Sequence, residues 1–449
     1  MLVHPPPLRR RSLGGPVLAG LFLLPLAAAA EPPDGRALYH GFVPFAAGRE
    51  ATPRRLPPDL AACANCHGPL AEGRREGGTA APRIAWAALL RPRGELPPYA
   101  SAEAVGQAIL AGTGRGGRPL DPVMPRFRLE GAELEALLDH LRRAGTAADL
   151  PPGVTADTVT LGTVLPLSGP AAAGGRAVLA GLAEVFEAAS AAGGVHGRRL
   201  RLLALDGAAP GTEAAMRRLL AQLVHAVVGG MWPADAAIEA MLAAARVPHV
   251  GSLVVRQEAR ETGAWTADLL PPLAEQQAVL AQAMTGCGGG GPRLALRLAA
   301  AAPGGEAGTR WFDAAAPLAA ARRDGPPGCL GLGLGGLAAL GGPPPPGWET
   351  WLVLPFPAAL LRPEPGGPRP EPWRQLGRAA ARLAVEWLAR AGAVLHEGSL
   401  PEQRAATRGD EPLPGLPVRF SRQRRHAWDA DVIEITGAPR AAITGASSP

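Results

Sequence analysis

The segment Cys63-Ala64-Asn65-Cys66-His67 constrains this chain more than any other. At C-x-x-C-H spacing, two thiols can form thioethers to the vinyl groups of one haem, and the adjacent imidazole then reaches the iron. The alternatives for Cys63 and Cys66 are a redox dithiol or half of a zinc site. Because no second cysteine pair lies in this half of the sequence and His67 follows directly, we interpret the motif as a covalent haem c site with His67 as iron ligand.

Met124 is the predicted second iron ligand. It lies in a predicted loop just before a helix and is flanked by prolines, a setting that favours ligation over a place in the core. A plain core methionine remains the alternative for Met124, and His40 and His140 are the alternative sixth ligands. Arg118 is either a partner of a haem propionate or an ordinary solvated arginine.

The predicted ligand pair determines the predicted chemistry. Two protein ligands leave the iron without an open position, which disfavours reactions with O₂ or peroxide, and so argues against an enzyme with catalytic residues. A neutral thioether favours the ferrous state and raises the potential relative to two histidines. We therefore expect a one-electron carrier, with redox partners such as a dehydrogenase or an oxidase.

Helical patterns surround the motif. Leu134, Leu137, Leu138 and Leu141 recur at the spacing of one helix face, and Gly145 ends that helix. Short helices are also predicted near residues 35–39 and 101–112. The rest of the segment is predicted to be loop.

Residues 31–148 resemble the class I-type cytochrome c family over nearly their whole length. The resemblance rests on Gly35 to Tyr39, Cys63 to Gly68, Gly112 through Gly117 and Met124 to Phe127. It implies an all-α domain in which Cys63 and Cys66 anchor the haem while His67 and Met124 hold its iron. The stretch between Tyr39 and Cys63 is longer than the family pattern, which leaves the packing of the first helix open.

The N-terminus is typical of an exported protein. Arg9 to Arg11 precede an apolar run from Val17 to Leu26, and small residues follow from Ala27 to Ala30. The run is too short to span a bilayer, so residues 1–30 are a predicted signal peptide. No later stretch is a predicted transmembrane segment, and we expect a soluble periplasmic protein.

Composition argues against nucleic acid as a partner. The chain of 449 residues has 45 basic residues, all arginine, and a net charge of +6, but they are scattered and only 2 tyrosines accompany them. Hydrophobic residues make up 47%, enough for buried cores, and the length predicts two or three domains.

The second half alternates strand and helix patterns. A linker at residues 149–157 leads into residues 158–440, and residues 441–449 are a predicted flexible tail. The βαβ repetition predicts an α/β fold with a parallel sheet covered by helices. The order is similar to that of the type I periplasmic substrate-binding proteins, the leucine/isoleucine/valine-binding group in particular, on Leu161 to Pro170, Gly193 to Gly197, Asp206 and Val228 to Gly230.

This second resemblance implies a two-lobed domain with a ligand between the lobes, at the carboxyl ends of strands. Ser168, Trp232 and Ser252 are the candidate ligand contacts, with a plain turn residue as the alternative for Ser168. Trp232 stands where the family offers small hydroxyl residues, which disfavours an amino-acid ligand.

Cys287 and Cys329 form either a disulfide, which export permits, or two free thiols. Both lie in glycine-rich tracts that we expect to be flexible. Residues 331–336 are rich in glycine too, but the sequence predicts no strand and helix around them, as a nucleotide site requires.

Two functions are therefore expected. The first is an exported c-type cytochrome whose binding-protein-like domain recognises a small ligand or a redox partner. The alternative is a periplasmic small-molecule receptor, for transport or sensing, with an accessory haem. An enzyme would need a vacant iron site, against which Met124 argues.

Overall fold

The computed structural model describes most of the chain between residues 33 and 434. The described ranges are 33–43, 46–48, 61–76, 79–258, 263, 265–287, 291–299, 308–339, 347–362, 371–409, 418–420 and 426–434. The predicted signal peptide at residues 1–30 and the predicted tail at residues 441–449 lie outside the described residues. Within these ranges, no helix is both long and apolar enough to cross a bilayer.

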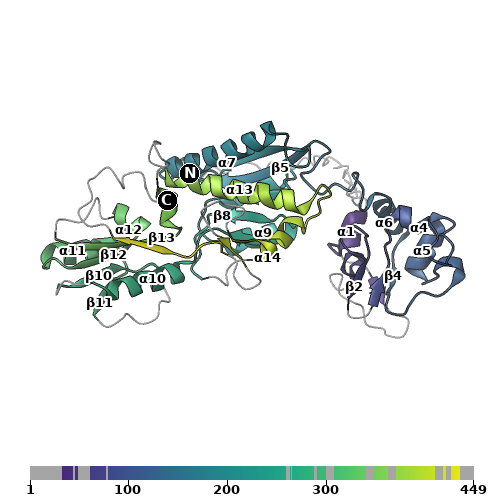
Figure 1. Cartoon of the computed structure of the whole chain (residues 1–449), viewed down its shortest axis with the longest axis horizontal. Helices are drawn as coiled ribbons and strands as arrows, with labels where there is room; N and C mark the ends of the chain where they lie inside the picture. The colour runs from purple at the N-terminus through teal and green to yellow at the C-terminus, as the bar shows by residue number, and fades with distance from the viewer. Residues whose placement is uncertain are drawn as a thin grey trace, which may run out of the picture.

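The N-terminal part is mainly helical and lies at one end of the molecule (Figure 1). Its helices are α1 (Gly35–His40), α3 (Cys63–His67), α4 (Trp86–Leu89), α5 (Ala102–Leu110) and α6 (Gly131–Arg143), with a 3-10 turn, η1, at Arg115–Gly117. Two short antiparallel ladders, which the sequence did not predict, pair β1 (Ala46–Gly48) with β4 (Arg126–Arg128) and β2 (Arg74–Glu76) with β3 (Thr79–Ala81).

Helices α1 and α6 approach each other closely because Gly35 has no side chain at their contact. A Cβ atom there would lie 1.8 Å from the carbonyl oxygen of Ala136. Asp34 caps the first turn of α1, and Glu130 and Glu133 form a capping box at the start of α6. These signals are local in sequence, which explains why both helices were predicted to within about two residues.

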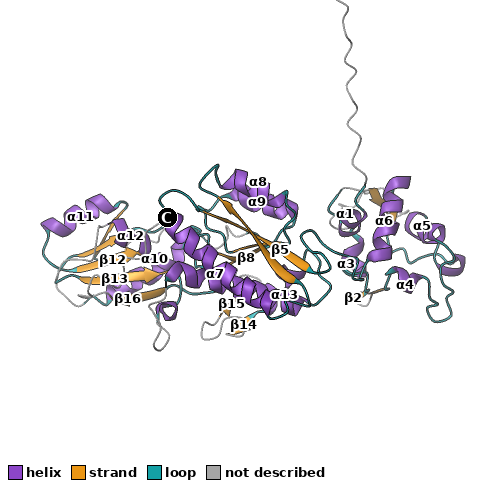
Figure 2. Cartoon of the chain, turned by 90° about the horizontal axis from the view of Figure 1, so that it is seen from above, coloured by secondary structure: helices purple, strands orange, loops and turns teal. Residues whose placement is uncertain are grey.

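The first lobe of the following part is a five-stranded parallel sheet. In spatial order its strands are β6 (Arg199–Asp206), β5 (Thr158–Leu165), β7 (Ala226–Val228), β8 (His249–Ser252) and β9 (Thr266–Asp268). Helices α7 (Ala172–Ala191) and α13 (Pro372–Ala391) cover one face, and α8 (Thr212–Leu220) and α9 (Ala236–Ala245) cover the other (Figure 2). Because β6 and β7 lie on opposite sides of β5, the sheet has a topological switch point between β5 and β7.

The second lobe repeats this strand order. Its sheet runs β11 (Thr309–Phe312), β10 (Arg293–Leu296), β12 (Cys329–Gly333), β13 (Glu349–Leu354) and β16 (Asp431–Glu434), of which only β16 is antiparallel to its neighbour. The accompanying helices are α10 (Leu273–Thr285), α11 (Ala315–Asp324) and α12 (Leu334–Ala339). The chain passes from β9 into α10, returns from β13 to α13, and crosses again before β16. The smaller elements are η3 (Ala358–Leu361), α14 (Ser399–Ala406), β14 (Arg408–Gly409) and β15 (Val418–Arg419).

The glycine-rich segment at residues 331–336 corrects two expectations. It is not flexible, because it runs from the fully buried strand β12 directly into α12, and so it does have strand and helix context. Gly331 allows close packing, because a Cβ atom there would lie 2.9 Å from the sulfur of Met284. Alternating glycine hid the strand because glycine carries no hydrophobic signal.

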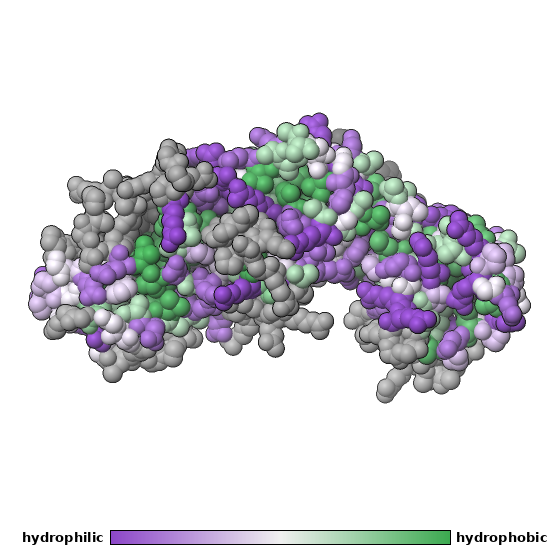
Figure 3. Space-filling view, viewed as in Figure 1, coloured by the Kyte–Doolittle hydropathy of each residue, from purple (hydrophilic) through white to green (hydrophobic). Residues whose placement is uncertain are grey.

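The N-terminal part meets the first lobe at the amino-terminal ends of its strands. Arg36 of α1 donates from Nε to Glu397 over 2.7 Å and from Nη2 to the other carboxylate oxygen over 3.0 Å, and it also pairs with Asp149. The guanidinium of Arg246, at the end of α9, lies 3.6 Å from the ring centroid of Phe42. Figure 3 shows the two parts in contact along the upper side of the view.

Buried and half-buried histidines gather around Arg36 at this junction. Burial lowers the pKa of His40, His140 and His225 to about 4, and it also lowers the pKa of His396. In the described part of the chain, Nε2 of the first three has no hydrogen-bond partner. These imidazoles are therefore neutral near pH 7, and the carboxylates of Glu397 and Asp149 face Arg36.

Candidate functional site

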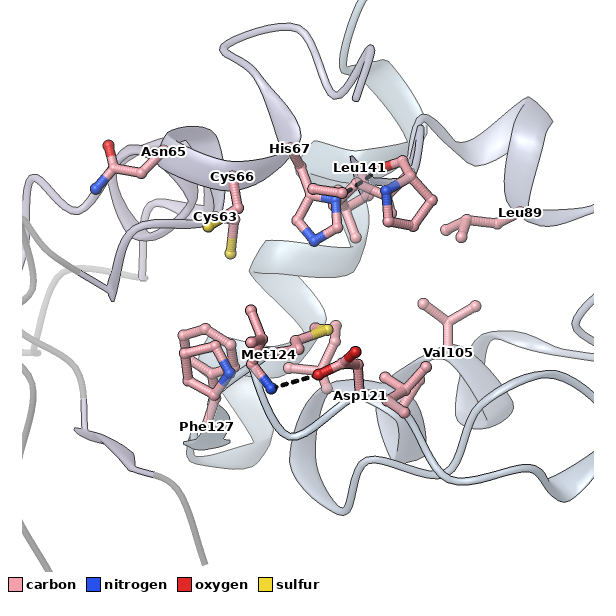
Figure 4. Close-up of a pocket in the computed structure, with 18 of the residues that line it drawn as sticks. Cys63, Asn65, Cys66, His67, Leu89, Val105, Asp121, Met124, Phe127 and Leu141 are labelled. Carbon is pink, nitrogen blue, oxygen red and sulfur yellow. Dashed lines mark hydrogen bonds between the residues drawn. The ribbon is translucent and has the colours of Figure 1, made fainter. Parts of the chain in front are cut away.

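A cavity of about 850 Å³ in the N-terminal part is lined by all four residues that the sequence selected. Cys63, Cys66 and His67 come from α3, and Met124 comes from the loop between η1 and β4. Figure 4 shows His67 on one wall and the sulfur of Met124 on the facing wall. The structure therefore brings together residues that are separated by more than fifty positions in the sequence.

His67 is held in a fixed orientation by its own backbone surroundings. Its Nδ1 lies 2.7 Å from the carbonyl oxygen of Pro82, so Nδ1 carries the proton and Nε2 faces the cavity (Figure 4). Burial lowers the pKa of this imidazole, and the hydrogen bond to Pro82, which raises the pKa, offsets only part of that effect. A neutral imidazole with a free Nε2 is the form that binds a metal.

The two thiols lie at one end of the cavity and are not bonded to each other. Burial raises the pKa of Cys63 to about 12, so its thiol is protonated at neutral pH. A redox dithiol needs a lowered pKa to form the reactive thiolate, and Cys63 has the opposite property.

The remaining lining residues are mostly apolar. The larger apolar ones include Leu89, Val105, Ile109, Phe127, Leu137 and Leu141, and the polar ones are Asn65, Arg74, Arg93, Tyr99 and Asp121. The cavity volume falls in the range of about 300–1,000 Å³ that is usual for cofactor sites. Thiols at one end, an imidazole on one wall and a thioether on the other are the donor set of a haem c, and the residues present fit that group.

The alternative ligands lie elsewhere. His40 and His140 are part of the junction with the first lobe and do not line the cavity. Arg118 is exposed and does not line it either. Sequence reasoning missed Arg115, which is buried and donates to the carbonyl oxygens of Arg91, Pro97 and Ala88, fixing the loop between α4 and α5.

The second predicted site lies at the switch point of the first lobe. Ser168 follows β5 and Trp232 follows β7, so both stand at the carboxyl ends where open α/β sheets bind ligands. Ser168 is exposed, and its hydroxyl bonds to Asp206, which together with backbone N–H groups lowers the pKa of that carboxyl to about 2. Its visible role is therefore to order the loops after β5 and β6.

Trp232 and Ser252 are buried by the lobe itself. The Trp232 ring stacks on His249 with centroids 4.9 Å apart, and its Nε1 has no hydrogen-bond partner among the described residues. The hydroxyl of Ser252 accepts a hydrogen bond from the backbone N–H of Val254 over 3.2 Å. Both side chains pack inside the first lobe, so neither presents an open contact surface in this structure.

A smaller cavity of about 530 Å³ lies beside the switch point. It is bounded by the starts of α8 and α9, with Thr212, Glu213 and Arg217 on one side and Pro233 and Asp235 on the other. Sequence reasoning missed it, because its walls come from two loops that follow different strands.

Cys287 and Cys329 form a disulfide in the structure. Glu349 lies next to them, with its carboxylate 3.6 Å from the Cys329 sulfur. Sulfurs bonded to each other offer no thiolate, so this trio is not a metal site in the oxidised protein.

Comparison with known proteins bears on the second part of the chain. Residues 158–321 match the family model described as periplasmic binding protein. The match starts at the first strand of the first lobe and runs into the second, and it confirms the prediction of a binding-protein-like α/β fold after the linker.

Solved structures with a similar arrangement include three binding proteins of low sequence identity. An extracellular ligand-binding receptor from Verminephrobacter eiseniae is 18% identical, with 61% of this chain and 97% of that chain covered and a TM-score of 0.47. A fatty acid ABC transporter substrate-binding protein from Thermomonospora curvata is 16% identical, covering 66% and 92% with a TM-score of 0.48. A leucine-binding protein from Thermotoga maritima is 16% identical, covering 62% and 96% with a TM-score of 0.47. A search of curated proteins gives no match.

Proposed function

We propose that this protein is an exported small-molecule receptor whose N-terminal part carries a covalent haem c. The receptor function is carried by the match of residues 158–321 to the periplasmic binding protein family. The two sheets with repeated strand order, joined by three chain crossings, support it because ligands of such folds bind where the lobes face each other. Export to the periplasm belongs to the same proposal.

A blocking variant tests the receptor function. A Ser168→Trp variant places a large side chain at the exposed carboxyl end of β5, while Ala192→Trp places the same side chain at an exposed site beyond the end of α7. Thermal stabilisation by a panel of amino acids, short carboxylates and fatty acids identifies the ligand. Ligand stabilisation should be lost in Ser168→Trp and retained in Ala192→Trp; equal stabilisation of both variants would place the site elsewhere.

One-electron transfer is a second candidate function, favoured by the cavity that joins Cys63, Cys66, His67 and Met124. A haem c bound there would supply reversible one-electron exchange at its iron. The chain's own residues would do the rest: Pro82 orients the imidazole, the thioether closes the facing side, and the apolar lining excludes water.

Absorption spectra of the protein matured with haem test this second function. A low-spin c-type spectrum is expected, with a methionine–iron charge-transfer band that disappears in Met124→Ala. A high-spin spectrum that the substitution leaves unchanged would refute His67/Met124 ligation and with it the electron-transfer function.

A further inference from the structure

The loop that carries Met124 has little regular structure of its own. It runs from Gly112 through η1 to Arg126, and its first part is closed because Leu120 N donates to the carbonyl oxygen of Gly112 over 2.8 Å. Met124 must nevertheless hold its sulfur at one place on the cavity wall. The contacts that fix this loop therefore decide where the sulfur lies.

Arg126 is the main side chain that holds the loop. From Nη1 it donates to the carbonyl oxygen of Met124 over 2.5 Å, and from Nη2 to the carbonyl oxygen of Leu120 over 3.1 Å. One guanidinium thus ties two turns of the loop together. Hydrogen bonds from a charged donor are stronger than neutral ones.

Gly112 leaves the space in which this guanidinium lies. A Cβ atom at Gly112 would be 2.0 Å from Nε of Arg126, and the backbone φ of +71° also favours glycine. Gly112 therefore both accepts the hydrogen bond from Leu120 and leaves room for the guanidinium of Arg126.

The other side of Met124 is held by Asp121. The backbone N–H of Met124 donates to the carbonyl oxygen of Asp121 over 3.0 Å, and that of Val123 donates to its carboxylate over 2.8 Å (Figure 4). Met124 is thus fixed at its N–H by a turn and at its carbonyl by Arg126. Its sulfur can then move only through its own side-chain torsions.

Arg126 itself stands on a rigid support. It begins strand β4, whose next residue, Phe127, is buried in the core and lines the cavity. The strand pairs with β1, with Arg126 opposite Gly48. Because Arg126 lies on a paired strand next to a buried core residue, its hydrogen bonds fix the loop relative to the core.

We propose that Arg126 is a positioning residue that holds the sulfur of Met124 opposite His67 and so keeps the sixth iron position closed to outside ligands. This inference rests on the proposed haem function. Arg126 does not line the cavity and acts on the backbone carbonyl of Met124. Without it, the loop gains conformations in which the thioether is withdrawn.

The test uses full-length protein matured with haem and imidazole as a competing ligand. Arg126→Leu removes the clamp, and Arg126→Lys keeps the charge but not the fork that reaches two carbonyls. Arg128→Leu is the matched control, because Arg128 is exposed and lies on the same strand. Ferric spectra give the intensity of the methionine–iron charge-transfer band, and titration gives the imidazole affinity.

Arg126→Leu should weaken the band and raise the imidazole affinity about tenfold or more, as expected for losing charge-assisted hydrogen bonds. Arg126→Lys should give an intermediate affinity, and Arg128→Leu should match the wild type. If Arg126→Leu fails to mature, an affinity of Arg126→Lys equal to the wild type refutes the clamp. Wild-type protein without the band would overturn the electron-transfer function itself, whereas an intact band in all variants would overturn this inference alone.

Discussion

Acidification should destabilise the junction between the N-terminal part and the first lobe. His140 is 1% exposed, and burial lowers its pKa from 6.5 to about 4. Between those two pH values the unfolded chain binds a proton that the folded protein does not, so the free energy of unfolding falls as the pH falls. The stabilisation is fully present above pH 6.5 and is lost progressively toward pH 4.

The magnitude follows from the width of that interval. Each pH unit is worth about 1.4 kcal/mol per proton, so lowering the pH from 6.5 to 5 costs about 2 kcal/mol for His140 alone. His40 and His225 have the same lowered pKa of about 4 and add to the effect. Titration of Glu397 does not contribute to this measurement. Burial opposes its ionisation, but hydrogen bonds from Arg36 lower its pKa to about 2, far below the measured pH range.

Urea unfolding at pH 7.5 and pH 5.0 measures this loss, with hydrogen exchange of α1 and α6 identifying the transition of the N-terminal part. His140→Phe removes one titrating ring from a buried site and should reduce the pH-dependent loss by about 2 kcal/mol. His196→Asn, at an exposed histidine, is the control and should leave the loss unchanged. An identical pH dependence in His140→Phe and wild type would refute the reasoning.

Three variants test the packing of the fold. Gly377→Leu should destabilise the first lobe by about 3 kcal/mol, because a Cβ there would lie 2.3 Å from the carbonyl oxygen of Val178; thermal unfolding measures it. Replacing Cys287 and Cys329 by serine opens a link across 42 residues and should cost about 4 kcal/mol, seen in the urea transition of the second lobe. Arg36→Met leaves two buried carboxylates unpaired and should cost about 3–5 kcal/mol in urea unfolding. The matching controls are Gly131→Ala, where a Cβ meets no atom within 4 Å, reduced wild-type protein, and Arg142→Met at an exposed ion pair. A loss in Gly377→Leu or Arg36→Met no greater than in its control would contradict that prediction. For the disulfide, the serine variant and the reduced wild type should lose the same stability, and a serine variant as stable as the oxidised wild type would contradict the prediction.

The residues that line the larger cavity were predictable as a set because most of their signal is local. Cys63, Cys66 and His67 lie within five positions, and a loop methionine before a helix is visible in the sequence alone. The residues that hold them in place were not predictable, because nothing in the sequence distinguishes Arg126 from a solvent-exposed arginine. Nor does any sequence pattern show that the carbonyl of Pro82 orients His67.

The two-lobed part was predictable in its pattern of strands and helices but not in its contacts. The alternation of strands and helices identified the parallel sheet, since buried strands carry continuous apolar residues. The inward direction of Trp232 and Ser252 depends on how β7 and β8 pack, which no spacing rule specifies. Arg36 and Glu397 are 361 positions apart, so only the folded chain reveals their pairing.

The attachment of the N-terminal part at the amino-terminal ends of the strands sets a distance between the two sites. Strand β5 has 8 residues and spans about 26 Å. A ligand at its carboxyl end and an electron carrier beyond its amino end would be separated by the whole depth of the lobe. Under both proposals, a partner of the ligand site and a partner of the haem site would approach opposite ends of the lobe, so neither would block the other.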